Sequence, residues 1–231
     1  PAPRLSLAVD FWSISVDDVI GALTLQELLA NSTFFEERIV RDAGGVITTL
    51  DLRNDNIGSR RTQGIEVSAR GGFDLAGGAL TVGVDGTYLA KKKDRFLPAS
   101  PWIERVGVFS YTGDLGLKWK HNAFINWTND QYSLSLSQIF RNGYENNRNI
   151  AGALTRPDYN ERVDNYIIYN FSAGARIAEG YTLTFGVKNI FDTDPPFAIT
   201  YDSATGAGSS WEPRVADPRG RSFTIAVEAK F

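Results

Sequence analysis

The C-terminal stretch of the chain alternates strictly between apolar and polar positions. Apolar residues occupy every second position from Phe223 to Phe231, and mostly polar residues lie between them. A period of two is typical of a β-strand with one apolar face. The run from Tyr181 to Phe191 alternates in the same way and carries aromatic residues at both ends. Lipid-facing strands need aromatic girdles at both interfaces, so this pattern favours strands of a membrane barrel.

Further stretches with the same alternation bring the number of predicted strands to eight. The expected strands cover residues 4–15, 61–74, 78–91, 114–127, 131–142, 162–177, 181–191 and 221–231. In the first of them the apolar residues change parity after Phe11. That switch predicts either a β-bulge or the point at which the strand leaves the lipid.

The lengths of the connections decide the fold class. They alternate strictly between long and short, and the long loops cover residues 17–60, 92–112, 143–161 and 192–220. All short turns therefore fall at one end of the sheet, together with the C-terminus. Bacterial barrels have short periplasmic turns, long extracellular loops and an even number of strands. We predict an all-β fold, an antiparallel transmembrane β-barrel.

The long loop over residues 17–60 is predicted to carry local structure. Thr24 is followed three residues later by Glu27, which is the spacing of a capping box, and this predicts a short helix that ends near Ala30. Residues 46–52 are predicted to form a strand extension beyond the membrane. The last loop, 192–220, contains four aspartates and four prolines, so it is not a central strand.

Composition excludes several classes of function. The chain has 231 residues, no cysteine and a net charge of −3. Disulfides and thiolate metal sites are therefore excluded, and no basic surface points to nucleic acid. No stretch approaches the roughly 18 apolar residues of a membrane helix. Barrel strands do not need such a stretch, because their apolar and polar residues alternate. The chain also lacks methionine and a signal peptide, which indicates a mature fragment, a processed piece or an incomplete sequence.

Three motifs resemble strands of the TonB-dependent outer-membrane receptors. Residues 186–197, GVKNIFDTDPPF, resemble the next-to-last strand of that family, and residues 218–231, PRGRSFTIAVEAKF, resemble its closing strand. Residues 62–67, TQGIEV, resemble a strand start that is common in the same family. Residues 12–29 are similar to a subgroup found in alphaproteobacteria and xanthomonads.

The resemblance implies a twenty-two-stranded barrel with a plug in its lumen, of which residues 1–231 would supply the last eight strands. The plug, the TonB box and the earlier strands are then expected outside this sequence. Such receptors import scarce large nutrients, namely iron–siderophore complexes, cobalamin or oligosaccharides, across the bacterial outer membrane. The alternative from a different class is a self-contained eight-stranded barrel with a structural or adhesive role.

The resemblance also implies a set of partners. These are outer-membrane lipid and lipopolysaccharide, the remaining strands and plug of the receptor, TonB acting through the plug, and the outer-membrane insertion machinery. No nucleic acid is expected. The closing strand is the expected assembly signal for the insertion machinery, through residues Phe223, Ile225, Val227 and Phe231.

No catalytic, cofactor or metal site is predicted. The only histidine, His121, lies within a predicted strand, and the acidic residues of the last loop are expected to be solvated or turn-forming. Aromatic and arginine side chains of the loops are candidates for ligand contact, although packing of loop on loop and ion pairing are equally compatible with them. The candidates are Trp102, Tyr111, Arg141, Tyr144, Arg148, Tyr201 and Trp211.

Overall fold

The computed structural model describes residues 4–21, 25–95, 97, 100–109, 115–146, 161–200 and 208–230. The chain divides into two compact units. The first unit comprises residues 1–13, 63–92 and 105–231, and the second comprises residues 14–62 and 93–104.

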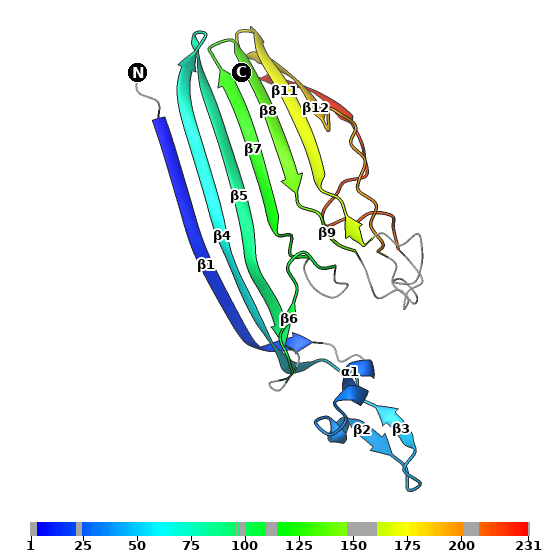
Figure 1. The fold of residues 1–231 in the computed structure, drawn as a ribbon. Coiled ribbons are helices and arrows are strands. Elements are labelled where there is room, and N and C mark those ends of the chain that lie inside the picture. The colour runs from blue at the N-terminus through cyan, green and yellow to red at the C-terminus, as the bar shows by residue number, and fades with distance from the viewer. Residues whose placement is uncertain are drawn as a thin grey trace. The chain divides into compact units, whose positions relative to one another are not determined.

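Eight long strands form one sheet in which neighbours along the chain are also neighbours in space (Figure 1). The strand order is β1-β4-β5-β7-β8-β11-β12-β13, and each neighbouring pair from β5 to β13 is antiparallel. This arrangement confirms the predicted antiparallel sheet. The strands are β1 (Arg4–Gly21), β4 (Asp55–Leu75), β5 (Gly78–Arg95), β7 (Trp119–Thr128), β8 (Tyr132–Arg141), β11 (Tyr166–Ala178), β12 (Tyr181–Lys188) and β13 (Ser222–Ala229).

The register of the strands places apolar residues side by side on one face of the sheet. One row of directly paired residues crosses six strands: Val82, Ile125, Leu136, Phe171, Val187 and Phe223. The alternate positions carry polar residues, as in the paired row Thr81, Asn126 and Ser135. We call these two surfaces the apolar face and the polar face. Ile225 on the apolar face is 74% exposed, so the chain does not cover this face with protein of its own there.

Three short turns lie between long connections, as the sequence predicts. The turn between β4 and β5 places Ala76 and Gly77 at positive φ, 51° and 71°, which matches the twist of a two-residue hairpin. Between β7 and β8, the side chain of Asn129 accepts hydrogen bonds from the backbone amides of Gln131 and Tyr132 (3.0 and 2.6 Å). The turn between β11 and β12 contains Gly180 with φ 75°.

Strand boundaries differ from the predicted ones mainly next to the long connections. β1 continues through the parity change after Phe11, and its residue with positive φ is Asp18 (φ 55°). β7 begins at Trp119 rather than near residue 114. Two two-residue strands in the connections are not predicted by the sequence: β6 (Ile103–Glu104), which pairs with β5, and β9 (Tyr144–Glu145). The predicted strand 162–177 is divided into β11 and the short strand β10 (Arg162–Val163), which pairs with β9.

The second unit has a hydrophobic core of its own. Helix α1 (Leu25–Ala30) confirms the predicted short helix, although the capping residue Thr24 lies outside the described residues. A 3-10 turn, η1 (Glu36–Arg38), leads into a hairpin of β2 (Ile39–Arg41) and β3 (Ile47–Leu50), so the predicted extension 46–52 pairs with a strand that the sequence did not reveal. The core consists of Leu28, Phe35, Ile39 and Leu97. No helix in the described part of the chain is long and apolar enough to cross a membrane.

Candidate functional site

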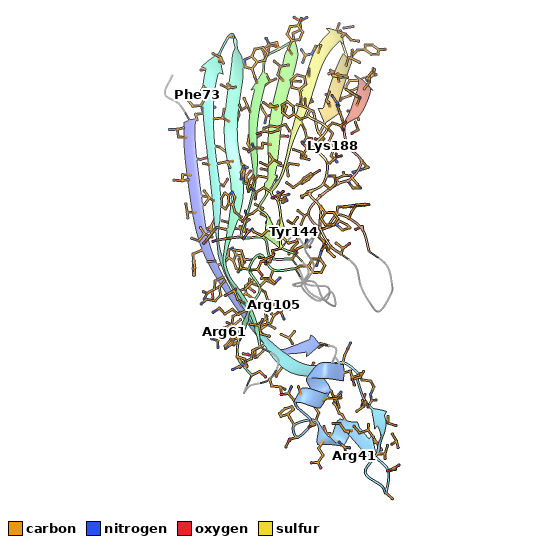
Figure 2. The ribbon with its side chains drawn as sticks, turned by 45° about the vertical axis from the view of Figure 1, so that its right-hand side comes forward. Arg41, Arg61, Phe73, Arg105, Tyr144 and Lys188 are labelled. Atoms are coloured by element: carbon orange, nitrogen blue, oxygen red, sulfur yellow. The ribbon has the colours of Figure 1, made fainter. Side chains whose placement is uncertain are left out.

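Three long connections of the first unit share one buried cluster, which includes Tyr144, labelled in Figure 2. We call it the connection cluster; its buried members are Phe109, Tyr144, Val163 and Ala198. These residues come from the connections β5–β7, β8–β11 and β12–β13. The backbone amide of Glu145 donates to the carbonyl of Gly107 (2.7 Å), and the amide of Phe109 donates to the carbonyl of Glu145 (3.1 Å). Apolar packing and backbone hydrogen bonds therefore join connections that are distant in the sequence.

Tyr144 lies at the centre of the connection cluster. Its side chain is 1% exposed, and its hydroxyl has no hydrogen-bond partner among the described residues. Burial raises the pKa of Tyr144 well above its ordinary value, and the neighbouring charge of Glu212 adds to the shift. The candidate ligand residue is thus engaged in packing of loop on loop in this structure.

An ion pair between a buried glutamate and an exposed arginine closes the cluster on the side of the last connection. Glu212 is 5% exposed and accepts hydrogen bonds from Nε and Nη2 of Arg214, both at 2.8 Å. Burial acts to raise the pKa of Glu212, but the hydrogen bonds from Arg214 outweigh it and the pKa lies below its usual range. The guanidinium of Arg214 also lies 5.6 Å from the ring centre of Phe109. Trp211, another candidate, immediately precedes this pair and is partly exposed.

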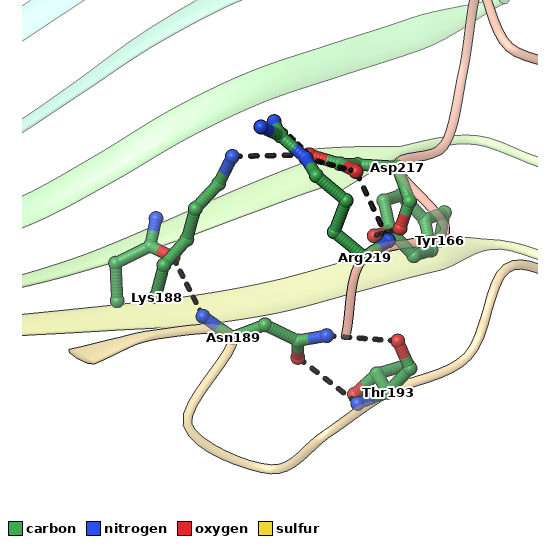
Figure 3. Close-up of polar contacts among 7 residues, drawn as sticks. Tyr166, Lys188, Asn189, Thr193, Asp217 and Arg219 are labelled. Carbon is green, nitrogen blue, oxygen red and sulfur yellow. Dashed lines mark hydrogen bonds and ion pairs between the residues drawn. The ribbon is translucent and has the colours of Figure 1, made fainter. Parts of the chain in front are cut away.

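Asp217 fastens the same connection to the polar face of the sheet (Figure 3). Its carboxylate accepts hydrogen bonds from Arg219 and from Nζ of Lys188 on β12 (3.1 Å). Its backbone carbonyl accepts a hydrogen bond from the hydroxyl of Tyr166 on β11 (3.3 Å). The hydrogen bonds from Arg219 hold the pKa of Asp217 well below its usual range. Close by, Ala216 packs against Tyr166 and Ile168.

The turn that leaves β12 is built around Asn189. This residue adopts φ 53°, a left-handed conformation that asparagine tolerates better than most residues. Its side chain accepts a hydrogen bond from the amide of Thr193 and donates one to the carbonyl of the same residue, both at 2.9 Å (Figure 3). Asp192, with φ 56°, accepts a hydrogen bond from the amide of Arg221 (2.7 Å), which links the start of the last connection to its end.

Charged side chains of both signs line a hollow on the polar face. Its volume is ≈ 330 Å³, and Asp10, Glu66, Asp85, Lys120 and Arg141 are among its lining residues. Arg141 is a predicted ligand candidate, and its Nη1 donates to the carbonyl of Phe140 (2.9 Å). The hollow is suited to a polar or charged partner of either sign.

In the second unit, two arginines lie over the ring of Trp102. The guanidinium groups of Arg61 and Arg95 are each 4.8 Å from a ring centre of Trp102. Cation–π contacts of this kind place positive charge at an aromatic surface. Arg60 forms an ion pair with Asp94 (2.9 Å) in the same unit. The second unit therefore presents a cationic aromatic group at a partly exposed tryptophan.

The structure brings the predicted candidates together only in part. Tyr144 and Trp211 belong to connections that meet in the first unit, with Arg141 three residues before Tyr144, whereas Trp102 belongs to the second unit. Tyr111, Arg148, Tyr201 and Phe231 lie outside the described residues. The remaining residues of the predicted assembly signal lie exposed on the apolar face of β13: Phe223, Ile225 and Val227.

Sequence reasoning missed several residues that build this region, namely Arg61, Arg95, Glu212 and Asp217. A local signal exists for the last two. Residues 212–214 and 217–219 both read acid–proline–arginine, and in both the arginine folds back onto the acid two positions earlier. Within the described residues, no group of three or more histidine, aspartate or glutamate side chains is placed to hold a metal ion.

Comparisons with known proteins give one family and one fold. A family model described as TonB dependent receptor-like, beta-barrel, matches residues 2–190. The crystal structure of a mutant of the ferric enterobactin receptor from Pseudomonas aeruginosa has a TM-score of 0.65 and 17% sequence identity. That alignment covers 98% of this chain and 29% of the receptor chain, so this chain spans less than a third of the receptor's length. No curated protein matches the sequence.

Proposed function

Because this chain belongs to the TonB-dependent receptor-like β-barrel family, we propose that it forms wall and outer connections of an outer-membrane transport receptor. The observation that carries the proposal is the division of the sheet into a largely apolar face and a polar face, with short turns at one end of the strands and long connections at the other. In hydrocarbon every backbone polar group has to be paired within the protein, and a barrel of antiparallel strands meets that requirement.

In this proposal the apolar face meets lipid and the polar face lines the lumen. The eight strands would form part of a twenty-two-stranded wall, and other segments of the receptor would supply the remaining strands, the plug and the contact with TonB. The order of the sheet supports a wider barrel: β1 and β13 lie at its two edges and are not paired with each other among the described strands. The self-contained eight-stranded barrel would require that pairing.

The charged polar face is a suitable surface for the plug. Arg70 and Asp85 form an ion pair there (2.9 Å), and Ser68 donates to the same carboxylate (2.6 Å). These side chains are partly exposed, so they are available to polar groups of a domain inside the lumen. Polar contacts of this kind are reversible at moderate cost, which suits a plug that rearranges during transport.

The transported ligand is proposed to be a scarce large nutrient: an iron–siderophore complex, cobalamin or an oligosaccharide. Among these three, the Arg61–Trp102–Arg95 group favours an anionic iron chelate. Two guanidinium groups beside one indole ring combine positive charge with a flat apolar surface. A neutral oligosaccharide would gain nothing from that charge.

The proposal is tested by uptake measurements on the whole receptor in a Gram-negative host. Cells receive radioactive ferric siderophores, cobalamin or labelled oligosaccharides, with and without TonB. We expect saturable uptake of an anionic ferric siderophore that requires TonB. Absence of TonB-dependent uptake for all three ligand classes would refute the transport function.

A double variant tests the cationic aromatic group. Arg61→Gln with Arg95→Gln is expected to raise the half-saturating ligand concentration about tenfold, which corresponds to about 1.4 kcal/mol of binding free energy. The matched control is Arg41→Gln, because Arg41 belongs to the same unit and donates to the carbonyl of Gly45 (3.0 Å) within its own hairpin. Equal effects of the double variant and the control would remove this group from the ligand site.

A further inference from the structure

The apolar face of the sheet contains a groove. The groove has a volume of ≈ 830 Å³ and extends from β1 to β11. Small residues of the apolar face, including Ala69, Gly71 and Ala123, line it together with larger neighbours such as Phe73 and Leu136. Its volume lies within the range of small-molecule pockets, roughly 300 to 1,000 Å³.

One part of the groove is polar. Gln138 and Tyr169 line it, and they belong to a chain of hydrogen bonds across β7, β8 and β11. Nε1 of Trp119 donates to Nδ1 of His121 (2.8 Å), and Nε2 of His121 lies 2.9 Å from Oε1 of Gln138. Nε2 of Gln138 in turn donates to the hydroxyl oxygen of Tyr169 (2.6 Å). The ring of His121 is stacked on Phe140, with centres 5.0 Å apart.

The donors and acceptors in this series of hydrogen bonds follow from Trp119, the residue at which the series begins. An indole nitrogen only donates, so Nδ1 of His121 has to accept and Nε2 of the neutral ring carries the hydrogen. His121 therefore donates to Gln138, and Gln138 donates to Tyr169. The hydroxyl hydrogen of Tyr169 is left as the last donor. No acceptor for it is present among the described residues.

A donor beside hydrocarbon requires an acceptor, since leaving a polar group unpaired in an apolar medium is energetically unfavourable. We propose that the groove holds an acyl chain of lipopolysaccharide and that a carbonyl oxygen at the head of that chain accepts the hydrogen bond from Tyr169. The inference rests on the proposed placement in the outer membrane.

The position of these hydrogen-bonded side chains along the strands places the polar part of the groove in the outer leaflet of the membrane. Trp119 is the first residue of β7, Gln138 lies three residues before the end of β8, and Tyr169 lies three residues after the start of β11. All three are near the end of the sheet that carries the long connections, which is the extracellular end in bacterial barrels. The lipid of that leaflet is lipopolysaccharide, and its acyl carbonyl groups lie between the sugar head group and the hydrocarbon.

The experiment is native mass spectrometry of the whole receptor extracted from outer membranes in a mild detergent. We expect one bound lipopolysaccharide per wild-type receptor. Tyr169→Phe removes the donor and keeps the ring, and the bound fraction should fall about fivefold, as expected for one hydrogen bond. Ala123→Phe fills the groove and should abolish retention.

Two matched controls lie on the same apolar face outside the groove. Tyr132→Phe removes a hydroxyl near the short turns, and Ala173→Phe adds a ring to β11; Tyr132 and Ala173 occupy apolar-face register positions. Both controls should retain lipid as the wild type does, and heat-modifiable mobility on gels verifies that each variant is folded. Retention of glycerophospholipid instead, retention of no lipid, or equal losses in Tyr132→Phe and Tyr169→Phe would overturn the proposal. Uptake by Tyr169→Phe is measured in parallel, so failure of lipid binding is distinguished from failure of transport.

Discussion

At the scale of single residues, polar side chains hold the last connection in place, mainly through hydrogen bonds to backbone groups. Asn189 is the clearest case, because it holds a left-handed turn and binds both backbone groups of Thr193. Asp217 acts in the same region as an acceptor for Arg219 and Lys188. The sequence indicates a turn at both places, but which backbone groups each side chain would reach depends on the fold.

Replacement of Asn189 by alanine should destabilise the receptor. The change loses two hydrogen bonds and forces a residue with a β-carbon and no polar group into the left-handed region, at a total of about 3 kcal/mol. Asn189→Gly should cost less, about 2 kcal/mol, because glycine adopts this φ freely. Urea unfolding of receptor refolded in detergent measures both values. An alanine variant more stable than the glycine variant would contradict this account of the turn.

The anchor at Asp217 predicts a dependence on pH. The folded pKa of Asp217 is lowered by Arg219 and Lys188, so its contribution is complete above the ordinary aspartate pKa of about 3.9 and is lost only as the pH falls through the lower folded value. Hydrogen exchange in residues 208–220, corrected for intrinsic rates, should therefore be unchanged between about pH 8 and pH 5. Asp217→Asn should increase exchange at every pH in that range. Loosening of the wild type already near pH 6 would argue against the ion-paired anchor.

At the scale of elements, the strands could be predicted because their signal is local. Alternation along each strand and the segregation of turn lengths identify all eight, and the observed register joins their apolar residues into one face. The connection cluster could not be predicted. Phe109 and Ala198 are far apart in sequence, and neither lies in a periodic pattern that would indicate burial. The likeness of residues 12–29 to a subgroup and the assembly role of the closing strand stay predictions.

The connection cluster gives a prediction about Tyr144. Tyr144→Phe removes a hydroxyl that is buried without a partner among the described residues, so it should be neutral or stabilise the receptor by about 1 kcal/mol. Tyr144→Ala should instead cost roughly 3 to 5 kcal/mol, because it leaves a cavity among three connections. Resistance of the connections to limited proteolysis measures both changes. If Tyr144→Phe lowers ligand binding while resistance is kept, the hydroxyl has a role in the ligand site rather than in packing.

At the scale of the whole molecule, the two faces of the sheet should respond differently to charge. Leu136→Arg places a cation on the apolar face and should cost about 2 to 4 kcal/mol at mid-membrane depth. Ser135→Arg, one residue away on the polar face, should be tolerated because the lumen is hydrated. The fraction of heat-modifiable receptor recovered from outer membranes compares the two. Equal recovery would contradict the assignment of the faces.

The second unit and the connection cluster differ in how they can be altered. Three connections of the first unit share one core, so replacing any one of them with a foreign loop removes packing from the other two. Loop-by-loop exchange of specificity between receptors should therefore fail in that part of the chain. The segment from α1 to β3 has its own core of Leu28, Phe35 and Ile39, closed by Leu97. The tip of its β2–β3 hairpin, at Gly44 and Gly45, is exposed, so in the proposed orientation an epitope tag inserted there would be displayed on the cell surface.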